Sequence, residues 1–370
     1  MRLSRLLLPA ALLGLSAAQA GLAPALAAPP SAVPPASAGL VVPKPKAGRA
    51  RPLIAVVADS DGAQTTDFIV PYGVLKASGV AEVRSVSTRS GAIAMTRGLR
   101  IVADETIATF DGREPIGADI VVVPAQAKPK SAALRTWLRG QSAKGATIVS
   151  VCEGARVLAE AGLLRGKRAA THWAALDAMA KSHPETTWVR DLRYVQDGAV
   201  ITTAGVSASL PASLALVEAI GGRAAAAATA ARFGTDAWGP GHRTARFAIG
   251  RDDRAAAAAA LRAKRERVEI PIAGGVDEVS LALQVEAWGR SLRSRVVTTR
   301  IGGAPVRSRS GLLIVPDAEP RPGSHVVEAA ALPAVTALEA TLAQMERRYG
   351  PAAARFAVLG MEYVPQAEGN

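Results

Sequence analysis

The sequence has a single cysteine, Cys152, among its 370 residues. One thiol excludes an internal disulfide, so hydrophobic burial must hold the fold together, and a chain of this length can form about two domains. The histidines are also few, and they show no metal-ligand spacing with one another or with Cys152. We therefore expect no metal site and no cofactor. The four histidines are His172, His183, His242 and His325.

Dense runs of charge are missing as well. The formal net charge is +13, but the basic residues are scattered, and the nearest approach to a basic run is residues 262–267. Such scattering is not typical of a nucleic-acid-binding surface, so no nucleic-acid partner is expected. Beyond the N-terminus we expect no stretch long and apolar enough to be a transmembrane helix.

The N-terminus has the features of a secretory signal peptide. A short basic region precedes an apolar stretch at residues 6–17, which is too short to cross a bilayer comfortably. Small-x-small cleavage sites follow at residues 18–20 and 25–27. We predict that residues 1–27 are a signal peptide and that the protein is periplasmic or secreted.

Short apolar strands alternate with helices over residues 52–235. This order predicts an α/β fold with a doubly wound parallel sheet, of the flavodoxin-like kind. Ligands of such sheets bind at the carboxyl ends of the strands. The predicted strands cover about residues 53–57, 82–86, 101–102, 120–124, 147–151 and 200–203, and the predicted helices about residues 65–76, 131–143, 157–164 and 207–220.

The second half of the chain repeats parts of the first, which predicts an internal repeat. It has no counterpart of residues 126–204, so we predict a degenerate second α/β copy with a strand near 268–272 and a helix near 279–288. The matching segments are 67–75 with 278–286, 86–89 with 297–300, 98–104 with 311–317, 210–216 with 332–338, and 231–233 with 354–356. The predicted division is a signal peptide at 1–27, a disordered Pro/Ala-rich linker at 28–51, a first domain at 52–235, a linker at 236–267 and the degenerate copy at 268–362.

Cys152 stands where a β-branched run ends and a helix is predicted to begin. Gly154 follows two residues later, so the pattern is the thiol form of a nucleophile elbow, in which a sharp turn lifts the side chain above the sheet. Helix amides should make this thiol more acidic than a free cysteine, whereas the adjacent Glu153 opposes that effect. The alternative is that Cys152 is only a small, buried, apolar side chain.

Several blocks together resemble a known family over residues 52–235. They are the elbow at 150–155 with its continuation through 158–169, then Thr171-His172-Trp173, Asp67-x-x-x-Pro71-Tyr72, and residues 203–207. This combination resembles the DJ-one/ThiJ/PfpI superfamily, which has the class I glutamine amidotransferase-like fold. Within it, the sequence looks most like isonitrile hydratases and the amidase-like N-terminal domains of AraC-type regulators.

The resemblance implies a role for each matching position. Cys152 would be a nucleophile or an oxidation-sensitive thiol, Asp67 would handle a proton beside it, and His172 would act as a base or hydrogen-bond partner. Asp67 could equally be an N-cap or helix-start aspartate, and His172 a packed, capping side chain. The oxyanion or lining positions would be Ala125, Glu153, Gly154, Thr203 and Gly205, of which Thr203 and Gly205 could equally be ordinary turn residues.

Three departures from the family pattern limit what the resemblance implies. Ala125-Gln126 replaces a glycine pair whose amide helps to form the oxyanion hole. Glu153 stands where the protease-like branch has histidine, which argues against a Cys–His protease dyad. The degenerate copy also stands where the regulator branch has its DNA-binding domain, so DNA regulation is not expected.

The sequence is compatible with two functions. The first is an exported hydrolase, hydratase or lyase that uses Cys152 on a small molecule. The second is a non-catalytic ligand-binding or redox-sensing module derived from an AraC-type regulator domain. Because members of this family commonly dimerise, we expect either a homodimer or an intramolecular pseudo-dimer, in which the second copy replaces a partner subunit.

The signal peptide gives the first testable prediction. Protein recovered from the periplasm or the medium should begin after residue 20 or after residue 27, because signal peptidase cuts after small residues. N-terminal sequencing or intact-mass measurement checks this. Active protein that is cytosolic and still begins at Met1 would contradict it.

Overall fold

The structure is a computed structural model that describes residues 39–365. The described residues lie within one compact unit. The predicted signal peptide and the first residues of the predicted 28–51 linker lie outside the described residues.

The first segment forms a seven-stranded sheet. Its strand order is β10-β11-β7-β6-β1-β2-β5, and every neighbouring pair is parallel except β10 with β11. The α/β fold with a parallel, doubly wound sheet is thus confirmed. The strands are β1 (Leu53–Ala58), β2 (Glu82–Ser87), β5 (Glu105–Thr106), β6 (Ile120–Val123), β7 (Thr147–Ser150), β10 (Tyr194–Asp197) and β11 (Val200–Thr203), with a separate short pair β8 (Arg168–Ala169) and β9 (Thr187–Trp188).

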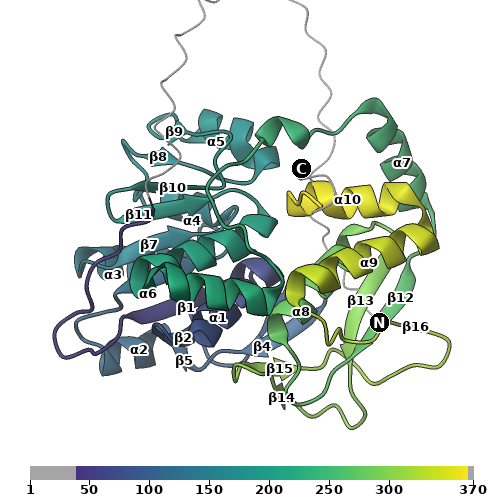
Figure 1. The fold of residues 1–370 in the computed structure, drawn as a ribbon, viewed down its shortest axis with the longest axis horizontal. Helices are drawn as coiled ribbons and strands as arrows, with labels where there is room; N and C mark the ends of the chain where they lie inside the picture. The colour runs from purple at the N-terminus through teal and green to yellow at the C-terminus, as the bar shows by residue number, and fades with distance from the viewer. Residues whose placement is uncertain (1–38, 366–370) are drawn as a thin grey trace, which may run out of the picture. The chain divides into compact units, whose positions relative to one another are not determined.

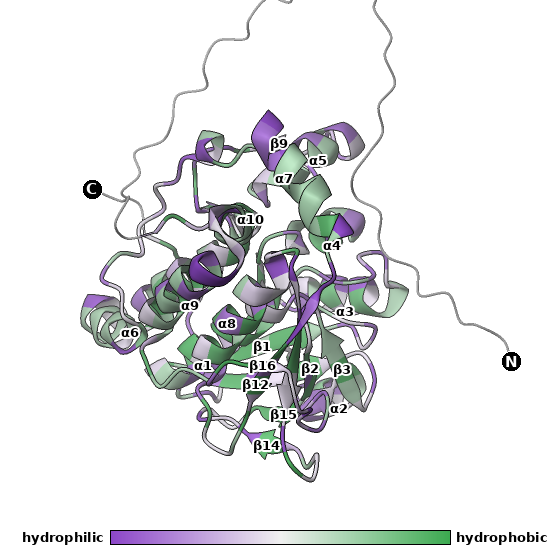
Figure 2. Cartoon of the chain, turned by 90° about the vertical axis from the view of Figure 1, so that its right-hand side faces the viewer, coloured by the Kyte–Doolittle hydropathy of each residue, from purple (hydrophilic) through white to green (hydrophobic). Residues whose placement is uncertain are grey.

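Helices cover both faces of this sheet. Alternate residues of β1 enter two different hydrophobic cores, as the period of two in a strand requires, and β1 is coloured as hydrophobic in Figure 2. One core includes α1 and α6, which lie over one face of the sheet (Figure 1), and the other includes α3 and α4. The helices are α1 (Thr65–Ser78), α2 (Ile107–Arg113), α3 (Ala132–Ala143), α4 (Gly154–Glu160), α5 (Leu176–Ser182) and α6 (Ser209–Phe233).

The second segment forms a smaller α/β layer. Its three strands are parallel in the order β13-β12-β16, and helices α9 and α10 pack with α8. The strand and the helix predicted near 268–272 and 279–288 are present as β12 and α8. The elements are β12 (Glu266–Pro271), α8 (Glu278–Arg290), β13 (Ser294–Thr299), β16 (His325–Val326), α9 (Ala334–Tyr349) and α10 (Pro351–Met361).

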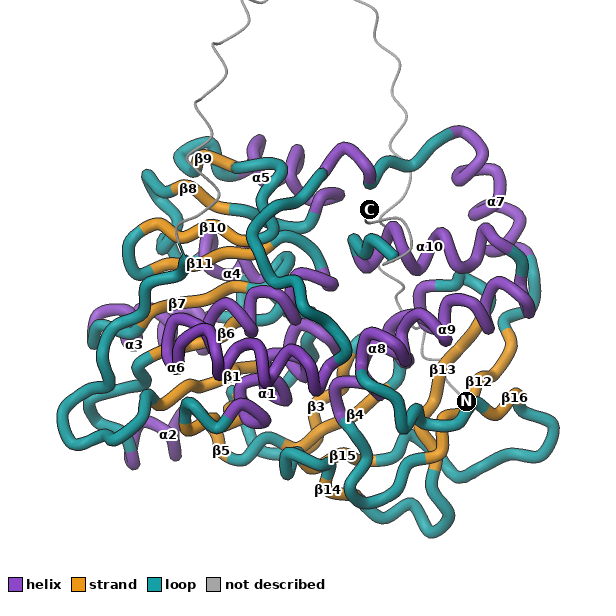
Figure 3. The backbone as a smooth tube through the Cα atoms, viewed as in Figure 1, coloured by secondary structure: helices purple, strands orange, loops and turns teal. Residues whose placement is uncertain are grey.

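The two segments meet through a helix pair and a shared sheet. Strands β3 (Ala92–Met95) and β4 (Leu99–Val102) join β14 (Val306–Arg307) and β15 (Leu313–Val315) in the order β14-β15-β4-β3, which can be followed in Figure 3. Ile101 of β4 lies opposite Ile314 of β15 in antiparallel register. Helix α1 packs on α8, where a Cβ placed on Gly73 would lie 2.5 Å from a methyl carbon of Val279. Gly73 therefore allows the two helices to approach closely.

A hydrogen-bond pattern of the first segment recurs in the second. Asp104 Oδ2 accepts from the backbone N of Ser85 at 2.9 Å and from its Oγ at 2.8 Å. Asp317 Oδ2 accepts from the N and Oγ1 of Thr298, both at 2.9 Å. In both cases the acceptor lies 19 residues after the donor. The two strand-and-loop units are therefore built alike.

The long C-terminal helices of the two segments are each interrupted at a glycine with similar backbone angles. Helix α6 is interrupted at Gly222, with φ 83° and ψ 170°, and α9 is separated from α10 at Gly350, with φ 86° and ψ 169°. A positive φ of this size favours glycine.

Helix α6, with the short turn before it (Val206–Phe233), is long and apolar enough to pass a membrane-span test by length and composition, so our expectation that no later stretch would do so was wrong. It packs against α1 as a core helix.

Both predicted linkers contain ordered structure. In the first, Lys46 N donates to Asp119 Oδ1 at 2.8 Å and Arg49 Nη1 to Asp119 Oδ2 at 2.8 Å, so its last residues are bound to the domain and are not a free spacer. In the second, residues 236–267 include helix α7 (Arg251–Arg262). The expectation of a disordered linker does not hold for these residues.

The helix contact at Gly73 predicts a large effect on stability. Gly73→Leu should lower the free energy of unfolding by about 2–4 kcal/mol, because the new side chain overlaps α8 and overpacking of a core is costly. Gly140 is a matched control, since it also lies in a helix and a Cβ there meets nothing within 4 Å. Urea unfolding of Gly73→Leu and Gly140→Leu tests this, and equal midpoints would contradict the close packing of α1 on α8.

Candidate active site

Cys152 lies at a sharp turn between β7 and α4. Its φ is 56°, in the left-handed region that residues with side chains rarely adopt. Two threonines hold this backbone: Cys152 N donates to Thr203 Oγ1 at 3.2 Å, and Thr171 Oγ1 donates to Cys152 O at 3.1 Å. Strained backbone of this kind is typical of functional sites.

Gly154 allows the turn to close against the neighbouring strand. A Cβ at Gly154 would overlap the carbonyl oxygen of Val123, at the end of β6. Any side chain at this position would therefore push α4 away from the sheet. The predicted Cys-x-Gly pattern thus has a steric cause, and the carboxyl ends of β6 and β7 are held close beneath the thiol.

Asp67 is wholly buried in the first turn of α1, at the same end of the sheet. The residue that precedes α1 is Gln64, so Asp67 is not the N-cap, but it is the helix-start aspartate that the alternative interpretation also allowed. Its Oδ2 accepts from the backbone N of Ala125 at 3.3 Å, and its Oδ1 has no hydrogen-bond partner among the described residues. Burial raises the pKa of Asp67 well above its ordinary value, and the charge of Glu286 raises it further.

The thiol of Cys152 is nearly as enclosed, with 5% of the residue exposed. Burial raises its pKa well above the ordinary value, and the charges of Asp67 and Glu153 act in the same direction. Arg290 and a hydrogen bond from the Glu153 backbone oppose this rise without reversing it. The expectation of an unusually acidic thiol was therefore wrong for this closed arrangement, because the thiolate would lose its hydration.

His172 is turned toward the backbone and not toward the thiol. Its Nδ1 accepts from Ala174 N at 3.2 Å, so the ring is neutral and Nε2 donates to Gly360 O at 3.2 Å. Burial lowers the pKa of His172, which is consistent with a neutral ring. With both nitrogens engaged, His172 is the packed, capping side chain of the alternative interpretation, and it borders the site.

The remaining predicted lining residues are placed as follows. The amide of Ala125 donates to Asp67, so in this arrangement it is not a free oxyanion donor. Glu153 points outward, with 42% of its side chain exposed, and pairs with Arg156 at 3.0 Å. Thr203 supports the elbow, and the amide of Gly205 donates to Glu362 Oε2 at 2.6 Å.

Helix α8 brings two charged residues to this site that were not predicted from the sequence, Glu286 and Arg290. Glu286 is wholly buried, and its Oε1 accepts from Arg290 Nε at 2.5 Å, with Arg97 Nε 3.9 Å away. Both Glu286 and Arg290 are close enough to influence the pKa of Asp67. The only sequence signal was the match of this helix to α1 together with a Glu–Arg pair at (i, i+4) spacing.

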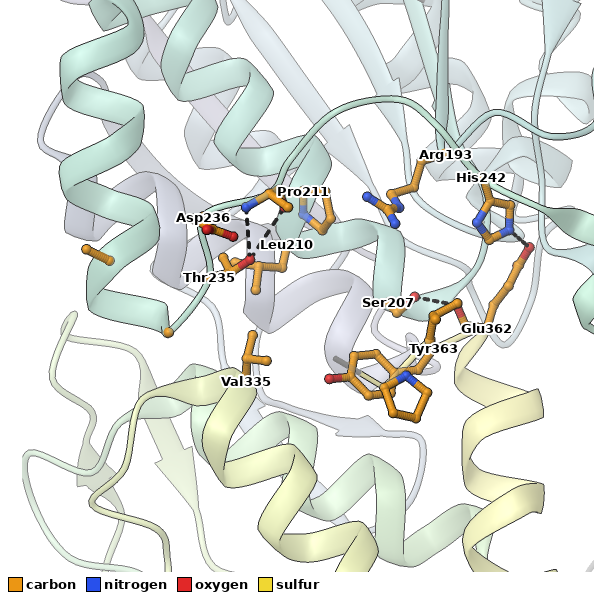
Figure 4. A pocket seen from close by; sticks show the side chains of 15 residues that line it. Arg193, Ser207, Leu210, Pro211, Thr235, Asp236, His242, Val335, Glu362 and Tyr363 are labelled. Carbon is orange, nitrogen blue, oxygen red and sulfur yellow. Dashed lines mark hydrogen bonds and ion pairs between the residues drawn. The ribbon is translucent and has the colours of Figure 1, made fainter. Parts of the chain in front are cut away.

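A second missed pair lies beside His172. Glu362, just after α10, accepts from Trp173 N at 3.2 Å as well as from Gly205, and its Oε1 is 2.6 Å from His242 Nε2. Figure 4 shows His242 and Glu362 meeting at the edge of a cavity of about 660 Å³. No three His, Cys, Asp or Glu side chains are grouped for a metal ion within residues 39–365.

Comparison with known proteins agrees with this geometry. Residues 53–219 match the model of the DJ-1/PfpI family. An isonitrile hydratase from Pseudomonas putida is 32% identical over 163 residues, which cover 43% of this chain and 68% of that protein. The chain belongs to the DJ-1/PfpI family. The family resemblance seen in the sequence is thereby confirmed.

Other relatives within the DJ-1/PfpI family carry different names. A deglycase from Pyrococcus horikoshii is 30% identical over 155 residues, covering 41% of this chain and 86% of the deglycase. The HTH-type transcriptional regulator CdhR from Pseudomonas aeruginosa is 35% identical over 136 residues, covering 36% of this chain but only 38% of the regulator. The similarity to CdhR therefore concerns less than half of that protein.

The raised pKa of Cys152 gives a prediction about thiol reactivity. Because alkylation needs the thiolate, iodoacetamide should modify Cys152 at pH 7 at least about tenfold more slowly than a free cysteine. The rate should still be rising above pH 9 and should increase in denaturant. A rate that levels off below pH 8 in the folded protein would show an acidic thiolate and contradict the buried, neutral thiol.

Proposed function

We propose that this protein is an exported thiol enzyme that adds water to a small molecule at an unsaturated or carbonyl carbon. The observation that supports this most strongly is the position of Cys152, strained at φ 56°, beside the buried carboxyl group of Asp67. A neutral carboxyl group next to a thiol is suited to proton transfer at neutral pH. The names of the hydratase and deglycase relatives are consistent with such chemistry.

In the first step the Cys152 sulfur would bond to the substrate carbon while one π bond to its heteroatom breaks. Asp67 would give its proton to that heteroatom and take the proton of the thiol, so that no thiolate has to form in the closed site. In an isonitrile the proton would go instead to the terminal carbon, which then carries both the sulfur and the new hydrogen. In the second step water would attack the same carbon. The carbon–sulfur bond then breaks and the thiol recovers a proton through Asp67, which leaves the hydrated product and the original enzyme.

We also propose that residues 268–362 are a degenerate second copy that takes the place of a partner subunit. The repeated Ser85–Asp104 and Thr298–Asp317 hydrogen bonds and the similar glycine conformations at Gly222 and Gly350 support this. So does the pairing of β4 with β15, in which Ile101 faces its sequence counterpart Ile314, as at an approximate twofold axis. The protein would then be an intramolecular pseudo-dimer.

We also propose that the protein is exported. The basic start, the short apolar stretch and the small-x-small sites of residues 1–27 support secretion. An oxidising compartment would also expose a lone thiol to oxidation, and the burial of Cys152 protects it there.

One observation favours the alternative of a ligand-binding or sensing module. Residues 359–362 cover His172 and Trp173: Trp173 Nε1 donates to Leu359 O at 2.9 Å, and His172 donates to Gly360. A site closed in this way can bind and respond to a ligand without turnover. The similarity to part of the regulator CdhR is consistent with this candidate.

Turnover distinguishes the two candidates. The protein should be incubated with an isonitrile and, separately, with a glycated amine, and both product and protein-bound adduct should be measured by mass spectrometry. We expect an adduct on Cys152 and a hydrated or hydrolysed product from one of them. Asp67→Asn, which keeps the shape of the side chain, should lower kcat by about 10²–10⁴-fold.

Controls decide whether a loss of activity is specific. Cys152→Ser should abolish both adduct and product, whereas Asp111→Asn on α2 should leave kcat unchanged, because Asp111 contacts only Trp137 and Gln141 in the described structure. Product formed equally well by Cys152→Ser would contradict thiol catalysis. Saturable binding without turnover of any such compound would favour the sensing module.

A further inference from the structure

Glu362 occupies an unusual position for a buried carboxylate. It ends α10 with φ 55° and ψ 40°, in the left-handed region, and only 1% of its side chain is exposed. The end of α6 has a similar conformation at Gly234, with φ 76° and ψ 35°, where glycine accepts it without cost. Glu362 therefore adopts a backbone conformation unfavourable for a residue with a side chain, and the contacts of that side chain must compensate.

Those contacts are three donors directed at one carboxylate group. The backbone N–H groups of Gly205 and Trp173 donate to Oε2 at 2.6 and 3.2 Å, and His242 Nε2 lies 2.6 Å from Oε1. Two backbone amides from separate loops that converge on one oxygen form an anion-binding concavity. The carboxylate of Glu362 fills it as a bound ligand would.

Gly205 packs directly against the carboxylate of Glu362 and the ring of His172. A Cβ at Gly205 would overlap Glu362 Oε2, and it would also lie 2.7 Å from a ring carbon of His172. The absence of a side chain therefore lets a carboxylate reach the amide. The bound group lies directly beside His172, on the loop that follows the elbow helix.

A cavity lies next to Glu362 and His242. The cavity of about 660 Å³ in Figure 4 is bordered by Glu362 and His242 and by the polar side chains of Arg193 and Ser207. Ser207 Oγ donates to the backbone O of Glu362 at 2.5 Å, so the end of α10 forms part of the wall of this cavity and would have to give up this bond to move. A volume of this size is sufficient for a small organic molecule.

We propose that the amides of Gly205 and Trp173, together with His242, form a carboxylate-binding subsite, which Glu362 fills in the closed chain. A small molecule that carries a carboxylate group would take this subsite when the end of α10 moves away. The inference deepens the proposed function and rests on it only in naming the substrate class. Gly205 lies two residues after Thr203, whose Oγ1 accepts from Cys152 N, and Trp173 lies two residues after Thr171, which donates to Cys152 O. A ligand held here therefore lies near the elbow.

Removal of the internal carboxylate tests the subsite. Glu362→Gly should vacate it and also suits the left-handed backbone, so the helix end need not distort. Sodium acetate is the probe, with sodium chloride at equal ionic strength as the control. Acetate at about ten times its Kd should raise the Tm of this variant by roughly 2–4 °C.

Amide signals show where acetate binds. In ¹⁵N–¹H spectra of Glu362→Gly, acetate should shift the Gly205 and Trp173 resonances, and chloride should not. The wild-type protein should respond far less, because a tethered carboxylate competes at a high effective concentration. Adding His242→Phe to the glycine variant should weaken acetate binding, since one of the three donors is lost.

A second variant tests the subsite if Glu362→Gly does not fold. Glu362→Gln retains the shape but not the charge, and acetate should displace it at lower concentration than it displaces the wild-type side chain. A folded variant whose Gly205 and Trp173 amides do not respond to acetate overturns the subsite. Cys152→Ser should not alter acetate binding, so failure of the thiol chemistry and failure of the subsite are separate results.

Discussion

The packing of α8 on α1 is the contact on which the site depends. The two helices approach closely because Gly73 has no side chain, and this brings Glu286 and Arg290 of the second segment beside Asp67 of the first. Burial is the main cause of the raised pKa of Asp67, and the charge of Glu286 on α8 raises it further. The second segment is therefore not only a covering layer, since it contributes to the electrostatics of the site.

Two features of Cys152 have opposite effects on its reactivity. Burial and the nearby carboxyl groups raise the pKa of the thiol, while the strained turn presents its side chain at the carboxyl ends of β6 and β7. In the proposed mechanism, proton exchange with a neutral Asp67 would reconcile them, because nucleophilic attack would then not require a free thiolate. The end of α10 also covers His172 and Trp173, so a ligand that binds beside them would have to displace residues 359–362.

Much of the fold could be predicted from sequence, because strands and helices leave local patterns. The apolar runs of β1, β6 and β7 and the Cys-x-Gly turn needed no distant information. The acidity of the thiol was predicted in the wrong direction, because local helix amides are visible in sequence but burial by α8 and α10 is not. Glu362 and His242 were missed for the same reason: they are separated from each other by 120 residues and meet only in the folded chain.

The protonation state of Asp67 is the most direct test of this account. Infrared difference spectra of the wild-type protein and Asp67→Asn at pH 7 would show whether Asp67 contributes a protonated carboxyl band. We expect the band in the wild type, its loss in Asp67→Asn, and titration at lower pH in Glu286→Gln, because the charge of Glu286 raises the pKa of Asp67. An ionised Asp67 at pH 7 in the wild type would contradict the central claim that the second segment keeps a neutral acid beside Cys152.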